Sequence, residues 1–153
     1  MTETSSFDEP VAHKFFSATC FNRAWGLIDK ADRTPEEAET LIHLCHASLW
    51  HWSCRPDCTD QNRSIGYWQL SRVYAILGQA DNARHYAKRC LEASKQESPF
   101  FLGYAYEALS RSEKVAGNSE QAADYLKQAF AQAELVEAEE DRNMLLDDLN
   151  SLS

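Results

Sequence analysis

The segment from His43 to Cys58 gathers side chains that metal or nucleophilic chemistry would use. Zinc favours tetrahedral sites made of histidine nitrogen and cysteine sulfur, and a neighbouring cysteine and histidine can form a nucleophile–base pair. His51 and Cys54 are three residues apart, so their side chains could touch on a helix. The candidates in this segment are His43, Cys45, His46, His51, Cys54 and Cys58.

Helical geometry separates most of these side chains. At about 100° per residue, Cys45 shares one face with Trp52, whereas His43 and Cys54 lie nearly opposite. Only these last two and Cys58 could converge, and no orienting residue or oxyanion donor follows from the spacing. We therefore expect no metal, no cofactor and no catalytic residue here, and we interpret Cys45 as a small core residue.

The second informative pattern is a repeat with a period of 39 residues. Ile65 begins the stretch IGYWQLSRVYAILGQADNARHYAKRCLE, and Tyr104 begins YAYEALSRSEKVAGNSEQAADYLKQAFA. A period of this size is typical of stacked supersecondary units, each too small to bury its own apolar face. Aligning Gly78 with Gly117 pairs Leu70 with Leu109, Ser71 with Ser110, Arg72 with Arg111, Ala83 with Ala122, and Tyr86 with Tyr125.

The elements that carry these residues are predicted to be helices. Apolar residues recur at helical spacing, and Thr34 to Glu37 has the pattern of a capping box with proline at the first helical position. We expect three antiparallel hairpins and a terminal capping helix whose apolar stripe is Leu135, Ala138, Leu145 and Leu149. The expected helices span 10–31, 35–54, 62–77, 80–96, 99–116, 119–137 and 139–150.

From Asn22 to Ala131 the chain resembles the tetratricopeptide repeat (TPR) family. The resemblance rests on small and aromatic residues at equivalent places in each unit, although the spacing between units exceeds the family's usual 34 residues. It implies an all-α fold in which three hairpins stack as a right-handed superhelix closed by a capping helix. The residues that carry it are Tyr67, Leu70, Tyr74, Gly78, Ala83, Tyr86 and Cys90, then Tyr106, Leu109, Gly117, Ala122, Tyr125 and Ala129, and more weakly Trp25, Ala38, Leu41 and Cys45.

Stacking of this kind would place the first helix of each hairpin along a concave groove. Two arginines, Arg72 and Arg111, then occupy the same position in consecutive units, with Trp68 and Tyr104 between them. Guanidinium groups suit carboxylates or phosphates, and aromatic faces can stack on a ligand. The resemblance therefore implies a non-enzymatic interaction scaffold that binds an acidic peptide or another anionic ligand. The groove residues expected are Arg72, Arg111, Trp68, Tyr104, Glu107 and Arg23.

Three alternatives stay open at this point. Arg72 and Arg111 could instead pair with internal acids, and Glu107 is four residues before Arg111. A small-molecule or enzymatic pocket could form between the first hairpins from His46, Ser48 and His51 together with Arg72 and Glu107. Homodimerisation is also conceivable, because Trp50 and Trp52 point to nearly opposite faces of one helix and cannot share one core.

The bulk composition narrows the class of protein. The chain has 153 residues, 44% of them hydrophobic and 25% charged, as is usual for a globular domain. A net charge of −9 argues against nonspecific binding to nucleic acid or anionic membranes. Five cysteines without framework spacing, together with an acidic N-terminus, lead us to expect a cytoplasmic protein. We predict one domain over 1–153, with a flexible tail at 1–9 and repeat units near 10–54, 62–96 and 99–137.

Overall fold

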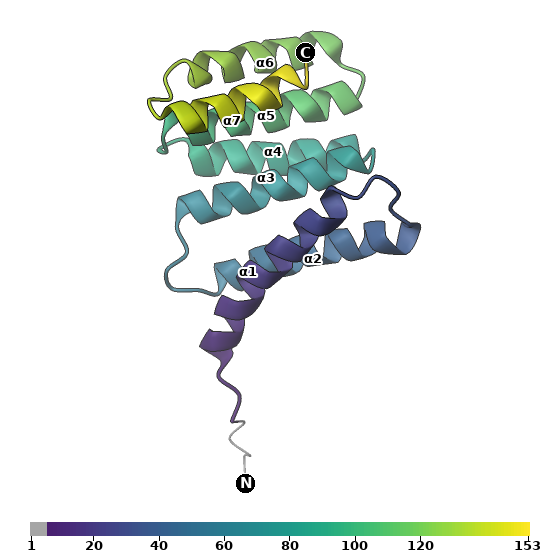
Figure 1. Ribbon diagram of the computed structural model, residues 1–153, viewed down its shortest axis with the longest axis vertical. Coiled ribbons are helices and arrows are strands. Elements are labelled where there is room, and N and C mark those ends of the chain that lie inside the picture. The colour runs from purple at the N-terminus through teal and green to yellow at the C-terminus, as the bar shows by residue number, and fades with distance from the viewer. Residues whose placement is uncertain (1–5) are drawn as a thin grey trace. The chain divides into compact units, whose positions relative to one another are not determined.

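The computed structural model describes residues 6–153, and over this range it contains seven helices and no strand. The prediction of an all-α fold is therefore confirmed. Contacts divide the chain into two compact units, one ending at Cys58 and the other spanning Thr59–Ser153. The helices are α1 (Glu9–Ile28), α2 (Pro35–Ser53), α3 (Asp60–Ile76), α4 (Ala80–Ser94), α5 (Pro99–Val115), α6 (Ser119–Ala133) and α7 (Glu139–Asn150), labelled in Figure 1.

The helix bounds agree with the sequence prediction to within a few residues. The largest differences are at the ends of α1, α4 and α6, which stop two to four residues earlier than expected, and at the start of α3, which begins two residues earlier. The expected tail at 1–9 falls partly on residues 1–5, which lie outside the described residues, and α1 already begins at Glu9. Assignment to a single domain and the handedness of a superhelix stay predictions. No helix between residues 6 and 153 is long and apolar enough to cross a membrane.

The first unit is the hairpin of α1 and α2. The predicted capping box is present, since the Thr34 hydroxyl accepts from the backbone N–H of Glu37 and the Glu37 carboxylate accepts from that of Thr34. The buried Ser48 hydroxyl donates to the backbone oxygen of Ser17 (2.7 Å), which ties the two helices together. Arg55 closes the hairpin further, because its Nη1 donates to the Ser17 hydroxyl (3.0 Å).

The second unit shows the sequence repeat as repeated contacts. Gly78 and Gly117 both have positive φ, 75° and 82°, which ends the first helix of each hairpin in a conformation that favours glycine. Serines at one repeat position donate to backbone oxygens twelve residues later in both hairpins, and an equivalent tyrosine pair stacks in each. The matching contacts are Ser71 with Ala83 and Ser110 with Ala122, then Tyr67 with Tyr86 and Tyr106 with Tyr125.

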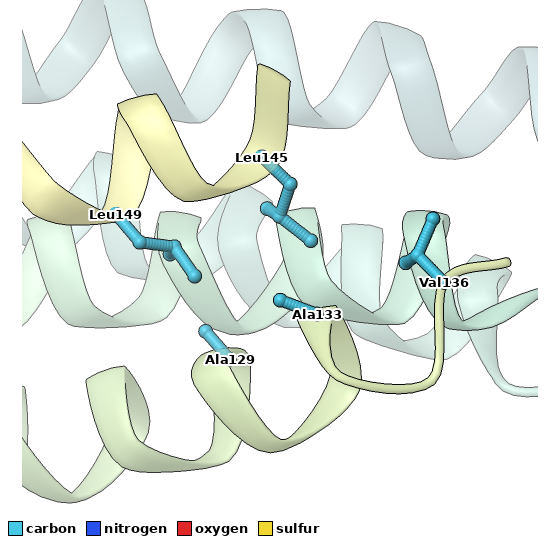
Figure 2. Packing of buried hydrophobic residues seen from close by; sticks show 5 residues of the cluster. All are labelled: Ala129, Ala133, Val136, Leu145 and Leu149. Carbon is cyan, nitrogen blue, oxygen red and sulfur yellow. The ribbon is translucent and has the colours of Figure 1, made fainter. Parts of the chain in front are cut away.

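The terminal helix α7 packs on the second hairpin of this unit. Leu145 and Leu149 are fully buried against Ala129 and Ala133 of α6, as Figure 2 shows. The fit is close at Gly103 of α5, where a Cβ atom would lie 2.5 Å from Leu145 Cδ2. The predicted capping role of α7 is thus confirmed by its burial.

Half of the predicted apolar stripe was wrong. Leu135 lies in the connection after α6 and is 61% exposed, and Ala138 is the exposed N-cap of α7. Their place in the core is taken by Val136, because α6 ends at Ala133 and the connection turns the next buried side chain inward.

Candidate functional site

The centre of the candidate site is a buried carboxylate, that of Glu107 on α5, whose side chain is 1% exposed. One carboxylate oxygen, Oε1, accepts from Nε (2.9 Å) and Nη2 (2.6 Å) of Arg111. The other, Oε2, accepts from the indole Nε1 of Trp68 on α3 (2.8 Å). A buried charge needs such partners, since burying an unpaired carboxylate costs far more than pairing it.

The repeat explains why these side chains meet. Trp68 and Glu107 occupy the same position in consecutive units, 39 residues apart, so they face one another where α3 lies beside α5. Arg72 and Arg111 follow one helical turn later, four residues beyond them. The alternative in which Arg111 pairs with Glu107 is therefore seen in the structure.

Arg72 is bound much more loosely than Arg111. Its Nη1 lies 3.9 Å from Glu107 Oε1, which is too long for a hydrogen bond. Its guanidinium carbon lies 5.6 Å from the centroid of the Trp68 ring, within range of a cation–π contact. The Nε atom is buried without a hydrogen-bond partner, and the side chain as a whole is 23% exposed. Arg72 therefore keeps donors that Glu107 does not use.

Tyr104 completes the aromatic part of the site. Its ring meets Trp68 edge to face at 5.5 Å between centroids, and its hydroxyl donates to Asp148 Oδ2 of α7 (2.7 Å). Burial and the neighbouring Asp148 carboxylate raise the pKa of the Tyr104 hydroxyl. The sequence analysis missed Asp148, because the acidic residues of α7 carry no signal that distinguishes one partner of Tyr104 from its neighbours.

The other predicted site residues, Arg23, His46 and His51, lie in the first unit. Arg23 is an exposed residue of α1. His51 Nδ1 lies 2.8 Å from Nδ1 of His13, a contact the sequence did not indicate, and burial together with His13 lowers the pKa of His51. Burial, with His43 nearby, also lowers the pKa of His46. Ser48, proposed for the alternative pocket, donates its hydroxyl hydrogen to the backbone oxygen of Ser17.

A second ion pair in the Thr59–Ser153 unit also escaped the sequence analysis. Glu113 of α5, 7% exposed, accepts two hydrogen bonds from the Arg84 guanidinium of α4 and one from the Asn118 amide. These donors lower the pKa of Glu113. The pair borders an open hollow that is also lined by Lys88 and Asp124. The lining of this hollow therefore carries both positive and negative charges. No three histidine, cysteine or carboxylate side chains in residues 6–153 converge as metal ligands would.

Comparisons with known proteins support the fold. No family model matches the chain, and no curated protein matches it. Among solved structures, a TPR-like protein from Chlorobium tepidum TLS is similar, with a TM-score of 0.67 and 14% sequence identity. The match covers 95% of this chain and 99% of that one. The fold is therefore TPR-like, in agreement with the resemblance seen in the sequence.

Proposed function

We propose that this TPR-like helical-repeat chain is an interaction scaffold that binds an anionic segment of a partner protein at Arg72. One observation carries the proposal: two guanidinium groups converge on a single buried carboxylate. The carboxylate balances one positive charge and leaves the other for a ligand. The two arginines, which the sequence analysis treated as equivalent, thus take different roles.

Arg111 serves as the structural partner. Both its Nε and its Nη2 donate to Glu107, so the fork is engaged and fixes the carboxylate in place. Arg72 is the recognition residue. Its guanidinium rests near the Trp68 ring, which limits the side chain's freedom before a ligand arrives and so reduces the entropy lost on binding.

The chemistry of the surface favours a carboxylate of a peptide, either a glutamate or aspartate side chain or a terminal carboxyl group. A planar guanidinium can donate two parallel hydrogen bonds to a carboxylate. Apolar area lies on the same helix, because Ile65 is 38% exposed one turn before Trp68. A peptide that presents a carboxylate beside an apolar residue would satisfy both features.

The proposal is tested by fluorescence anisotropy with a labelled hexaglutamate peptide carrying a free C-terminus. Arg72→Met removes the charge but leaves the contacts of Glu107 with Arg111 and Trp68 in place. We expect this variant to bind about tenfold more weakly, since a hydrogen bond to a charged group contributes about 1.5 kcal/mol or more.

Arg63→Met is the matched control. Arg63 lies on the same helix, is 43% exposed and pairs with the exposed Asp60. Arg63→Met removes one positive charge, as Arg72→Met does. Weaker binding by Arg72→Met than by Arg63→Met supports the proposal, provided that circular dichroism shows both variants folded. Equal effects of the two substitutions would indicate a general charge effect and would overturn the proposal. The proposal would also be overturned if the wild type bound a hexaglutamine peptide as tightly as hexaglutamate.

A further inference from the structure

Two histidines on different helices of the first unit meet through the same ring nitrogen. The Nδ1 atoms of His13 on α1 and His51 on α2 lie 2.8 Å apart. The ring centroids are 5.0 Å apart, so each Nδ1 lies on the side of its ring that faces the other ring. The His13 side chain is only 12% exposed. The contact is a hydrogen bond between imidazoles, in which one Nδ1 carries a hydrogen and the other offers a lone pair.

A carboxylate next to His13 favours one arrangement of the hydrogens. Glu9 Oε1 lies 3.5 Å from Nε2 of His13. The partner of one imidazole nitrogen decides which nitrogen is protonated, and a carboxylate favours a hydrogen on the nitrogen that it faces. Nδ1 of neutral His13 is therefore the acceptor in the pair, and Nδ1 of neutral His51 is the donor.

The histidine pair lies at the part of α1 that is least buried. The buried residues of this helix begin only at Ser17, although α1 begins at Glu9. Beside the pair, the Trp50 ring meets His13 at 5.3 Å and the Phe16 ring meets His51 at 5.4 Å, but Trp50 and Phe16 are themselves 58% and 40% exposed. A helix end without buried contacts unwinds easily, so its order depends on the few contacts that it makes.

We infer that the His13–His51 pair is a pH-sensitive contact, which holds the first two turns of α1 against α2 and releases them on acidification. One added proton keeps the contact, because a protonated imidazole can donate to a neutral one. A second added proton puts a hydrogen on both Nδ1 atoms, and two positively charged rings then repel each other at 2.8 Å. The closed contact therefore holds at most one added proton, whereas the separated rings hold two.

Other charged and titratable side chains flank the pair at the start of α1 and just after α2. Arg55 and Asp57 are joined to each other by two hydrogen bonds, so their charges largely cancel. Histidine is the side chain whose ordinary pKa falls between pH 5 and pH 8, so acidification over this range acts chiefly on the two rings. The flanking groups are Asp8, Glu9, Lys14, Cys54, Arg55 and Asp57.

The direction of the pH effect follows from the shift of one ring. Burial, and after it the neighbouring His13, lower the pKa of His51 in the folded chain below the ordinary 6.5. Its contribution to the closed contact is therefore complete above pH 6.5 and is lost as pH falls from there through the lower folded value. Because opening takes up one proton, the ratio of open to closed contact should rise by up to about tenfold per pH unit over this range.

NMR Cα chemical shifts of residues 9–16, measured in the full chain from about pH 7.5 to about pH 5, test the inference. These shifts report the helical population, which should fall in the wild type below pH 6.5 while α2 stays helical. His51→Asn places an amide where Nδ1 stands. The amide can donate to neutral His13 or accept from protonated His13, so this variant should keep α1 helical from residue 9 over the whole pH range.

His43→Asn is the matched control, because His43 lies on the same helix, is 75% exposed and pairs with the exposed Glu39. This variant should respond to pH as the wild type does. A wild type whose residues 9–16 stay helical down to pH 5 overturns the inference, as does an equal loss of helix in the wild type and His51→Asn. The ring nitrogen signals of the wild type give a readout that needs no variant. Coupled titration of His13 and His51 supports the pair, and two rings that titrate independently overturn it.

Discussion

Replacing Glu107 by glutamine tests whether one buried carboxylate organises the α3–α5 surface. The substitution keeps the size and shape of the side chain but removes its charge. Its two terminal atoms become one oxygen and one NH₂ group, whereas the three surrounding contacts all require an acceptor. Either Trp68 Nε1 or the Arg111 fork therefore faces a donor, and one of these partners is left unsatisfied.

The expected loss follows from these contacts. Hydrogen bonds to a charged group contribute about 1.5–3 kcal/mol each, and removing one partner of a buried ion pair costs about 3–5 kcal/mol. Arg111 and Arg72 are 18% and 23% exposed, so water can partly hydrate them after the carboxylate is gone. We therefore expect the lower end of the range, a loss of about 3 kcal/mol.

Urea unfolding at pH 7, followed by circular dichroism, measures this change. For a chain of this length about 3 kcal/mol corresponds to a fall of roughly 6–12 °C in Tm. Glu92→Gln serves as the control, because Glu92 is 65% exposed and its ion pair with Lys95 lies at the surface. The control should change stability by less than about 0.5 kcal/mol. A loss below about 1 kcal/mol for Glu107→Gln would refute the organising role of the carboxylate.

Three further substitutions or treatments test other parts of the structure. Gly103→Ala would push the new Cβ into Leu145. Although alanine has the better helix propensity, urea unfolding should show a free energy of unfolding lower by about 1–2 kcal/mol. A higher free energy of unfolding would mean that the Leu145 side chain or α7 shifts to accept the methyl group without cost. The folded-state pKa of Glu113 lies below the ordinary 4.5, so its contribution to stability is complete above that pH and is lost as pH falls through the lower value. The wild type should therefore lose more stability than Glu113→Gln between about pH 5 and pH 3, and parallel curves would contradict this. Burial raises the pKa of the Cys45 thiol to about 12, so iodoacetamide at neutral pH should modify the exposed Cys54 before Cys45. Peptide mass spectrometry measures the order of modification, and modification of Cys45 first would contradict this expectation.

Much of the fold could be predicted because local capping signals and the sequence repeat indicate where the helices begin and end. The capping box at Thr34 and the glycines at 78 and 117 gave helix limits close to those observed. The end of α6 could not be predicted as well. Apolar residues continue at helical spacing through Leu135, but the helix ends at Ala133 because the chain must turn to place α7 on α5 and α6.

The candidate site could be predicted only in part. The repeat placed Arg72 and Arg111 at equivalent positions, and both do lie near Glu107. Sequence spacing alone does not distinguish a buried carboxylate from an exposed one, so the unequal roles of the arginines could not be foreseen. The pairing of His13 with His51 was also missed, since it depends on the angle at which α1 crosses α2 and not on periodicity within either helix.

The hydrogen bond between Tyr104 and Asp148 has a consequence for how α7 and Arg72 influence one another. Asp148 holds Tyr104, the Tyr104 ring packs against Trp68, and Arg72 lies near the Trp68 ring. If a ligand at Arg72 strengthens this row of contacts, it must also strengthen the docking of α7, because thermodynamic linkage between two sites is reciprocal. Amide hydrogen exchange in α7 should then slow when the hexaglutamate peptide binds. The terminal helix would in that case report the occupancy of a surface to which it contributes only one carboxylate.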